Sequence, residues 1–498
     1  MMMVVGGDLK SFISPFHKCF QPEAGECTST NIEEQKMVFW KIPSQIKAWK
    51  NFQDEEEPHT QWDDLFFDLI FVGVAYNVGH LLEHSGPSLM GFTQCMMLFV
   101  IASKAWQDKV LFFSRFDVDD ILHKALNAVE YCIVGVLACH ITSFSLHSGQ
   151  NRQGMRGFTA LMLFHRVFVG FRWLEISYNA ERLEAMNLGT DEFRKNIYLL
   201  SLDAFAVYLA FATDVEQKTV LFLCFFTVVL DHCIHISKIM LGLYTRKRTV
   251  PHHISYLIHR IGEFTMLMVG ESVLSLSALR ITSPTWEFYL SLVCGFTITS
   301  SIMFIQYSTS VFHAEKHVLR RSGKYGIIWF HVKFCQAFFL VTFGVGLRMM
   351  LQKFASQKPP LQVLILFCGS LSMNVVLAML VECLQLGINP LYHRTSRYIF
   401  AAVSLNVFAL FLMPYLLYFS DYSKFASGAH CVIYASSIIL FQAICEVLDP
   451  NAKGIEGRFH HHIKRVTHAV TAVHHLRKTA QLRKQSFNSI NTKKGKAL

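Results

Sequence analysis

Long apolar stretches separated by short polar breaks dominate the chain from residue 63 to residue 447. A helix that crosses a bilayer needs about 20 predominantly apolar residues. Twelve stretches approach or exceed this length: residues 63–84, 88–112, 121–146, 156–180, 196–214, 218–243, 254–280, 285–312, 326–351, 361–387, 397–419 and 428–447. The pattern therefore predicts an all-α polytopic membrane protein with about 12 transmembrane helices.

The polar breaks divide the chain into four parts. An N-terminal segment, 1–61, precedes six predicted helices in 62–248. A second group of six occupies 249–449, and a basic, His-rich tail follows in 450–498. Lys and Arg are concentrated in the loops that twelve crossings place on the same side as both termini. By the positive-inside rule this side is the cytoplasm, so we expect both termini there.

Composition agrees with a membrane protein. Hydrophobic residues make up 52% of the chain and charged residues 16%, against roughly 25% charged in soluble domains. A net charge of +10 would indicate nucleic-acid binding in a soluble protein. Here the basic residues gather in loops and in the tail, so topology explains the charge and we predict no nucleic-acid partner. The pattern points to the lipid bilayer without distinguishing the plasma membrane from an internal one.

Two predicted helices carry carboxylates within their apolar stretches. The first has Asp64 and Asp68, which are four residues apart and share a face. An ionised group at the depth of Asp68 costs on the order of 2.5–3.5 kcal/mol. The seventh has Arg260, Glu263 and Glu271, with Glu271 near its middle. Such residues are candidates for transport or proton relay; the alternative is that they only pair with neighbouring helices or, near a helix start, favour the helix dipole.

The fourth predicted helix adds positive charge. Arg166 is a candidate counter-charge for the intramembrane acids. Arg172 and Glu175 are three residues apart, so we expect them to pair along the helix.

The connection after the second helix, RFDVDDILHK, alternates charges close to the membrane. We interpret it as a cytoplasmic latch in which Arg115 pairs with the surrounding acids and holds two helix ends together. A gate that makes and breaks these pairs is the functional alternative. The latch candidates are Arg115, Asp117, Asp119, Asp120 and His123.

Three segments together resemble the bacterial low temperature requirement A (LtrA) family: FFDLIFVGVAYNVGHL, RFDVDDILHK and HRIGEFTMLMVGESVLSL. Their order and spacing match, and the likeness extends over about 62–312. The resemblance implies a polytopic helical membrane protein. Two positions depart from the family pattern: Asp64 stands where Glu is usual, and His259-Arg260 where Glu-Arg is usual. The positions that match its polar signature are Asp68, Arg115, Asp117, Asp120, Arg166, Glu263 and Glu271.

Histidine patterns raise the question of an enzyme. His80 and His84 belong to an H-x-x-E-H pattern known from zinc peptidases. Asp231 and His235 also have a spacing that can ligate a metal. Further histidines occur at His313, His317 and His460 to His462. The predicted topology places His80 and His84 outside and the others inside, so we predict no metal, no cofactor and no enzymatic activity.

Two larger patterns bear on organisation. A shift of 199 residues superposes the seventh helix on the first and Glu263 on Asp64, which is compatible with a 6+6 arrangement of parallel halves. In the tail, HHHIKRVTHAVTAVHHLRK spaces its apolar residues as a basic amphipathic helix does. Such a helix binds a membrane surface or a calmodulin-type partner; a simply solvated helix is the alternative.

These patterns favour a transporter or channel for a small solute or ion. Protons would be carried by Asp68 and Glu271, with Arg260 or Arg166 as counter-charges, and we expect the first and seventh helices to face each other across one polar cavity. The rival is a non-transporting sensor or scaffold whose tail recruits partners. Substrate, coupling ion, organelle and oligomeric state have no signature in the sequence.

Overall fold

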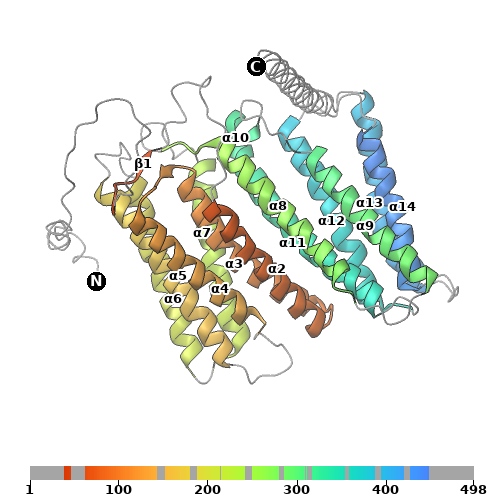
Figure 1. Cartoon of the computed structure of the whole chain (residues 1–498), viewed down its shortest axis with the longest axis horizontal. Helices are drawn as coiled ribbons and strands as arrows, with labels where there is room; N and C mark the ends of the chain where they lie inside the picture. Colours follow the sequence, from red (N-terminus) through yellow and green to blue (C-terminus); the bar gives the residue numbers. More distant parts are fainter. Residues whose placement is uncertain are drawn as a thin grey trace, which may run out of the picture.

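A computed structural model describes residues 39–45, 62–142, 152–179, 188–212, 215–241, 250–279, 285–308, 310, 317–353, 358–386, 394–419 and 427–447. Its long helices lie side by side with their ends at the top and bottom of Figure 1. Most of the predicted N-terminal segment, and the whole basic tail, lie outside the described residues.

The first group of helices follows the apolar stretches closely. α6 begins eight residues before the predicted start, because its first turns are polar yet continue the helix. The bounds are α2 (Trp62–Ser85), α3 (Leu89–Phe113), α4 (Ile121–Ile141), α5 (Arg152–Tyr178), α6 (Leu188–Phe211) and α7 (Gln217–Met240). Two short strands, β1 (Ser44–Gln45) and β2 (Phe116–Asp117), pair antiparallel at the upper end in Figure 1.

The second group has the same number of long helices and one short addition, α10. Its members are α8 (Ile254–Ser277), α9 (Trp286–Ser308), α10 (Val318–Arg321), α11 (Gly323–Gln352), α12 (Leu361–Leu386), α13 (Arg394–Phe419) and α14 (Gly428–Val447).

Seven of the described helices are long and apolar enough to cross a membrane: α2, α3, α4, α7, α9, α11 and α12. α5 and α8 contain several charged residues, including Arg166 and Arg260, which lower their apolar character. The fold is therefore that of an all-α multi-pass membrane protein. Twelve crossings and the cytoplasmic placement of both termini stay predictions.

Helix neighbours recur in the two groups. In the first group the pairs α2–α3, α2–α4, α3–α7, α4–α5, α5–α6 and α6–α7 pack together. The corresponding pairs in the second group are α8–α9, α8–α11, α9–α14, α11–α12, α12–α13 and α13–α14. This is the set of contacts that a duplicated six-helix unit would produce.

α11 is the central helix of the bundle. It packs against α8 and α12 of its own group and against α2, α3 and α7 of the other group. Its most apolar stretch is 83% buried inside the protein, so protein side chains rather than lipid surround it. Two glycines allow this: a Cβ at Gly344 would lie 3.2 Å from Cα of Ser272, and one at Gly346 would lie 2.9 Å from Cα of Phe367.

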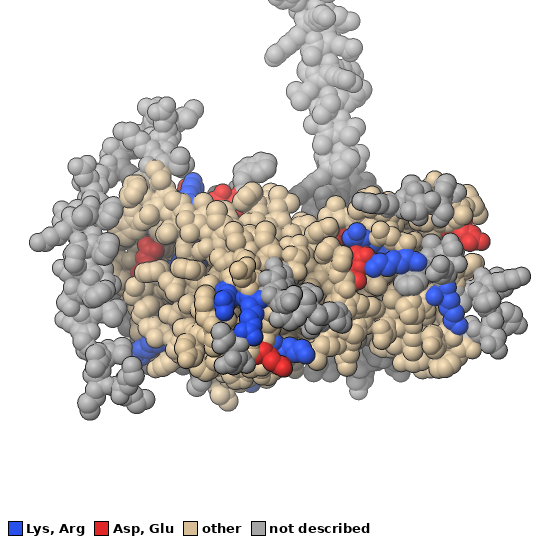
Figure 2. Space-filling model, turned by 90° about the horizontal axis from the view of Figure 1, so that it is seen from below, with Lys and Arg blue, Asp and Glu red and all other residues tan. Residues whose placement is uncertain are grey.

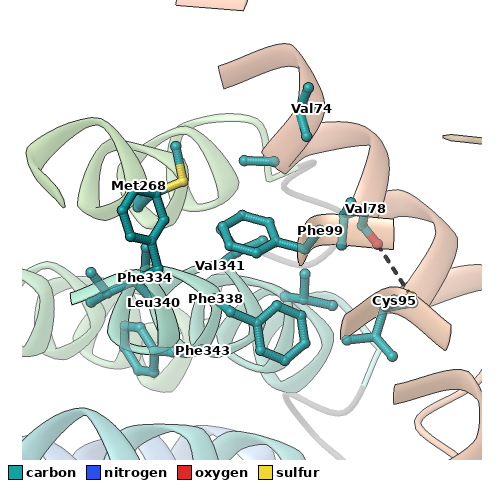
Figure 3. Packing of buried hydrophobic residues seen from close by; sticks show 14 of the residues in the cluster. Val74, Val78, Cys95, Phe99, Met268, Phe334, Phe338, Leu340, Val341 and Phe343 are labelled. Atoms are coloured by element: carbon teal, nitrogen blue, oxygen red, sulfur yellow. Dashed lines mark hydrogen bonds between the residues drawn. The ribbon is translucent and has the colours of Figure 1, made fainter. Parts of the chain in front are cut away.

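The hydrophobic core lies where α2, α3, α8 and α11 meet (Figure 3). Phe99 of α3 and Phe338 of α11 have ring centroids 5.5 Å apart. Val78 of α2 and Met268 of α8 are fully buried in the same cluster. This core joins the two helix groups, so polar side chains beside it lie at the junction between them.

Candidate functional site

Asp68 and Arg260 form a buried ion pair between α2 and α8. Nη1 and Nη2 of Arg260 donate to the two carboxylate oxygens of Asp68, each at 2.8 Å, and Nε1 of Trp106 donates to Oδ1 at 2.7 Å. The exposed fraction is 1% for Asp68 and 2% for Arg260. A bidentate pair with a third donor satisfies a carboxylate that lipid could not solvate.

Two further carboxylates share the same guanidinium. Nη1 of Arg260 donates to Oε2 of Glu263 at 2.8 Å, and Nη2 lies 3.9 Å from Oδ1 of Asp64. The hydroxyl of Tyr256 donates to Asp64 at 3.3 Å. The structure thus brings together four of the six predicted transport residues. Three carboxylates near one arginine give this cluster an excess of negative charge, which the protonation of one carboxylate would reduce.

Glu271 lies away from this cluster. It is eleven residues beyond Arg260 on α8, which corresponds to about 16 Å along the helix axis. Its Oε2 is buried without a hydrogen-bond partner among the described residues, and Oγ of Ser275 lies 3.5 Å from Oε1. The expectation that Asp68 and Glu271 share one cavity is therefore wrong. The two residues lie at different depths, and Ser272, next to Glu271, packs against Gly344 of α11.

Gly73 of α2 and Gly270 of α8 are not points of close contact between helices. A Cβ at Gly73 or at Gly270 would have no heavy atom within 4 Å. The close approach of α2 is instead at Gly79, where a Cβ would lie 2.9 Å from Cγ2 of Val345 on α11.

The arginines of α5 bind acids inside the first group rather than the α2–α8 cluster. Arg166 donates to Asp203 at 3.0 Å and to Asp231 at 3.4 Å, so it is not the counter-charge of Asp68 or Glu271. Arg172 makes a bidentate pair with Glu130 of α4, at 3.2 and 2.8 Å. The predicted pairing of Arg172 with Glu175 is wrong, because the fully buried Glu130 competes for the same guanidinium.

The RFDVDD connection is anchored by several separate contacts. Asp120 caps α4 by accepting from the backbone N–H of His123 at 2.9 Å, and it also contacts the His123 ring. The other ring nitrogen of His123 lies 2.9 Å from Glu175 of α5. Asp119 pairs with Lys124 at 2.7 Å, on the exposed surface.

The N-terminal segment takes part in this anchoring, which the motif alone did not indicate. Asp117 pairs with Ser44 in the two-stranded sheet. Nε1 of Trp40 donates to Glu175 at 3.0 Å, and the backbone N–H of Lys41 donates to Asp120 at 3.3 Å. The contacts hold residues 39–45 across the ends of α3, α4 and α5.

Arg115, at the start of this connection, faces a pocket. Its Nη2 donates to Nε2 of His252 at 2.8 Å, and Nδ1 of the same ring lies 2.6 Å from Oγ of Ser114. A guanidinium only donates, so Nε2 of His252 accepts and Nδ1 carries the proton. Burial beside Arg115 holds the pKa of His252 well below its ordinary value, which keeps this ring neutral.

The pocket has a volume of about 190 Å³ and opens between the two helix groups. It lies at the end of the bundle where β1 and α10 are found in Figure 1, which is the predicted cytoplasmic side. Figure 2 shows the opposite face, where charged side chains are few and scattered. The polar lining residues are Lys104, Gln107, Asp108, Arg115, Glu192, Lys195, Asn196, Asp231, His232, His235, His252 and His331.

Asp231 is the centre of the charge network on the polar wall. Its carboxylate oxygens lie 2.8 Å from Nζ of Lys104 and 3.0 Å from Nζ of Lys195, and Arg166 approaches from deeper in the bundle. Lys104 also pairs with Asp108, and Lys195 with Glu192. Sequence reasoning noted Asp231 only as a metal-type spacing and missed both lysines, because their partners come from different helices.

No metal centre forms among the described residues, where no three metal-ligating side chains gather. His235 is instead part of the pocket wall, and the rings of His80 and His84 stack on each other at 4.0 Å. His313 and His460 to His462 lie outside the described residues.

The helices, their lipid-compatible surfaces and their buried ion pairs define a multi-pass helical membrane protein. Comparison with family models gives one match, described as bacterial low temperature requirement A protein (LtrA), over residues 59–443. The chain therefore belongs to the LtrA family. The match continues beyond the 62–312 range in which sequence motifs carry the resemblance and includes most of α14. Searches of curated proteins and of solved structures returned no match.

Proposed function

We propose that this protein is a membrane transporter for a small solute and that the pocket beside Asp231 is its solute site. The observation that carries the proposal is the position of the pocket. Its walls come from α3, α6 and α7 of the first group and from α8 and α11 of the second. A site at such a junction changes its access when one group tilts against the other.

Two matching sets of helix contacts support this mechanism. We take residues 62–248 and 249–449 as two six-helix halves, since the same neighbour pairs recur in both. Halves of this kind can move as units around a site between them. The first half supplies the buried ion pairs of Glu130, Asp203 and Asp231, whereas α11 of the second half contributes mainly apolar packing.

A proton relay across the membrane is assigned to carboxylates outside the pocket. Asp64, Asp68 and Glu263 surround one guanidinium, so a proton added to this cluster reduces an excess of negative charge. Glu271 has a buried oxygen with no partner among the described residues, which is the condition of an acid that can take up and release a proton. These two positions, at different depths, would exchange protons with opposite sides of the membrane.

Purified protein in liposomes with an internal pH dye and an imposed potential tests this coupling. We expect proton entry that is lost in Glu271→Gln. Asp119→Asn is a suitable control, since Asp119 is an exposed carboxylate on the same protein. Equal proton entry in wild type and Glu271→Gln would remove this acid from the mechanism. Vesicles that stay silent with every solute tried would favour the non-transporting sensor or scaffold.

A further inference from the structure

The solute class follows from the walls of the pocket. We propose that the pocket binds a small monocarboxylate with an apolar body, together with one proton held by the hydrogen-bonded pair His232 and His331. This inference rests on the proposed function only in taking the pocket as the solute site.

The size of the pocket sets the first limit. A volume of about 190 Å³ corresponds to about six waters at ~30 Å³ each. That is enough for a compact organic acid such as benzoate. The lining also includes apolar side chains, among them Leu111, Leu257, Ile327 and Phe330. A ligand that fills the pocket therefore needs a polar end and an apolar body.

Unused hydrogen-bond donors indicate the sign of the polar end. An ammonium group has three N–H donors. Lys104 contacts Asp108 and Asp231, and Lys195 contacts Glu192 and Asp231, so each lysine keeps one donor for a further acceptor. The carboxylates are better satisfied, since Asp231 alone faces three cations. The free capacity on this wall suits a carboxylate ligand.

Charge balance then requires a proton. The side chains that line the pocket include three cations, Lys104, Arg115 and Lys195, and three acids, Asp108, Glu192 and Asp231. Outside the lining, Arg166 is balanced by Asp203, and Lys238 lies 3.7 Å from Glu192. A single anion entering this neutral and partly apolar space would leave an uncompensated charge, which is costly in a low-dielectric interior. One proton taken up with the anion restores neutrality.

The hydrogen bonds of His331 identify where this proton goes. Its Nδ1 lies 2.8 Å from the carbonyl oxygen of Ile327 and must donate to it. In the neutral ring Nε2 is then an acceptor, and it receives the N–H at Nδ1 of His232, 3.2 Å away. This leaves the lone pair at Nε2 of His232 for an incoming proton.

The proton site joins the two halves, because His232 is on α7 and His331 on α11. The charged and titratable groups around it come from every neighbouring helix of the pocket: Lys104, Asp108 and Arg115 at α3, Glu192 and Lys195 on α6, Asp231 and His235 on α7, and His252 before α8. His252 does not take the proton, since its Nε2 already accepts from Arg115.

Benzoate is a suitable probe, with benzamide as its uncharged isostere. Thermal unfolding of the purified full-length protein in detergent is followed with each compound at pH 7.5 and pH 5.5, where benzoate stays ionised. We expect benzoate to raise Tm and its apparent Kd to fall by up to tenfold per pH unit on acidification, as binding linked to one proton requires. Benzamide should leave Tm unchanged.

Two variants separate the anion from the proton. His232→Asn keeps an N–H donor for His331 but cannot be protonated, so benzoate binding should lose its pH dependence. Lys195→Gln should weaken benzoate at both pH values. His84→Asn is the matched control: His84 is in the last turn of α2, outside the pocket, so this variant should bind benzoate as the wild type does.

The inference would be overturned if benzamide, or chloride at the same concentration, raised Tm as much as benzoate does. It would also be overturned if benzoate binding to His232→Asn kept the pH dependence of the wild type. If His232→Asn does not fold, proton uptake on benzoate binding, measured in weakly buffered wild-type protein, decides the same point: uptake near one proton supports it and none refutes it. Benzoate binding without flux in liposomes would instead contradict the proposed transport and leave the binding site standing.

Discussion

The ion pair between Asp68 and Arg260 gives the sharpest test of the fold around the site. In Arg260→Gln, Asp68 keeps the N–H of Trp106 but loses both charge-assisted hydrogen bonds at 2.8 Å. The carboxylate is 1% exposed, so water cannot replace the lost donors. Breaking one partner of a buried pair typically costs about 3–5 kcal/mol. We expect a loss of this size in the free energy of unfolding.

A double variant also removes the negative charge that Asp68 keeps when Arg260 is lost. In the double variant Asp68→Asn with Arg260→Gln, two neutral amides replace the two charges. With Asp68→Asn measured as the second single variant, the double variant should lose about 0.5–3 kcal/mol less than the sum of the two single losses, since contacting residues couple by about that much. The control is Asp119→Asn, which breaks an exposed pair with Lys124 and should cost about 1 kcal/mol or less.

Reversible unfolding by SDS in mixed micelles measures these differences for each variant. Additive losses in the double variant, or a loss in Arg260→Gln no larger than that of the Asp119→Asn control, would refute the ion pair as the joint between α2 and α8.

Three further predictions address other parts of the structure. Trp40→Phe should loosen the N-terminal segment, because the N–H donor to Glu175 is lost. Protease should then cut near residue 46 faster than in the wild type, and equal cleavage rates would contradict the anchoring. Arg172→Gln should destabilise the fold by less than the roughly 3–5 kcal/mol of an unpaired buried charge, since Glu130 loses its closest cation but keeps Lys109 at 3.7 Å; Glu175→Gln should cost less still. Tags at residues 1 and 498 should both be protected from external protease in intact cells, and cleavage of one alone would mean an odd number of crossings.

The helix bounds could be predicted closely because a bilayer imposes a minimum apolar length on each segment. α2, α8 and α12 agree with their predicted ranges to within three residues at each end. The start of α6 is harder to predict, since the first turns of this helix carry Asp191, Glu192 and Lys195 and give no apolar signal. Glu192 and Lys195 form part of the pocket wall, so the helix whose start the sequence defines least well is one that builds the site.

Partners of the charged residues were less predictable. Helical spacing gives the face on which a residue lies, and a separation of eleven residues places Arg260 and Glu271 on the same face of α8. The same eleven residues also separate them by about 16 Å in depth, which the face alone does not express. Arg172 has Glu175 within reach on its own helix, yet it binds Glu130 from α4. Contacts between helices depend on how the helices pack, and one sequence carries no direct signal of this.

The claim that the pocket is a transport site is tested most directly by its access from the two sides of the membrane. A single cysteine replaces Gln107, a buried pocket-lining residue, in a background without the native cysteines. The protein is sealed in liposomes of known orientation and treated with a membrane-impermeant thiol reagent on one side at a time. We expect labelling from the cytoplasmic side and, at a lower rate, from the opposite side, with added solute changing the ratio of the two rates. Labelling confined to one side under all conditions, or absent from both, would contradict transport through this pocket.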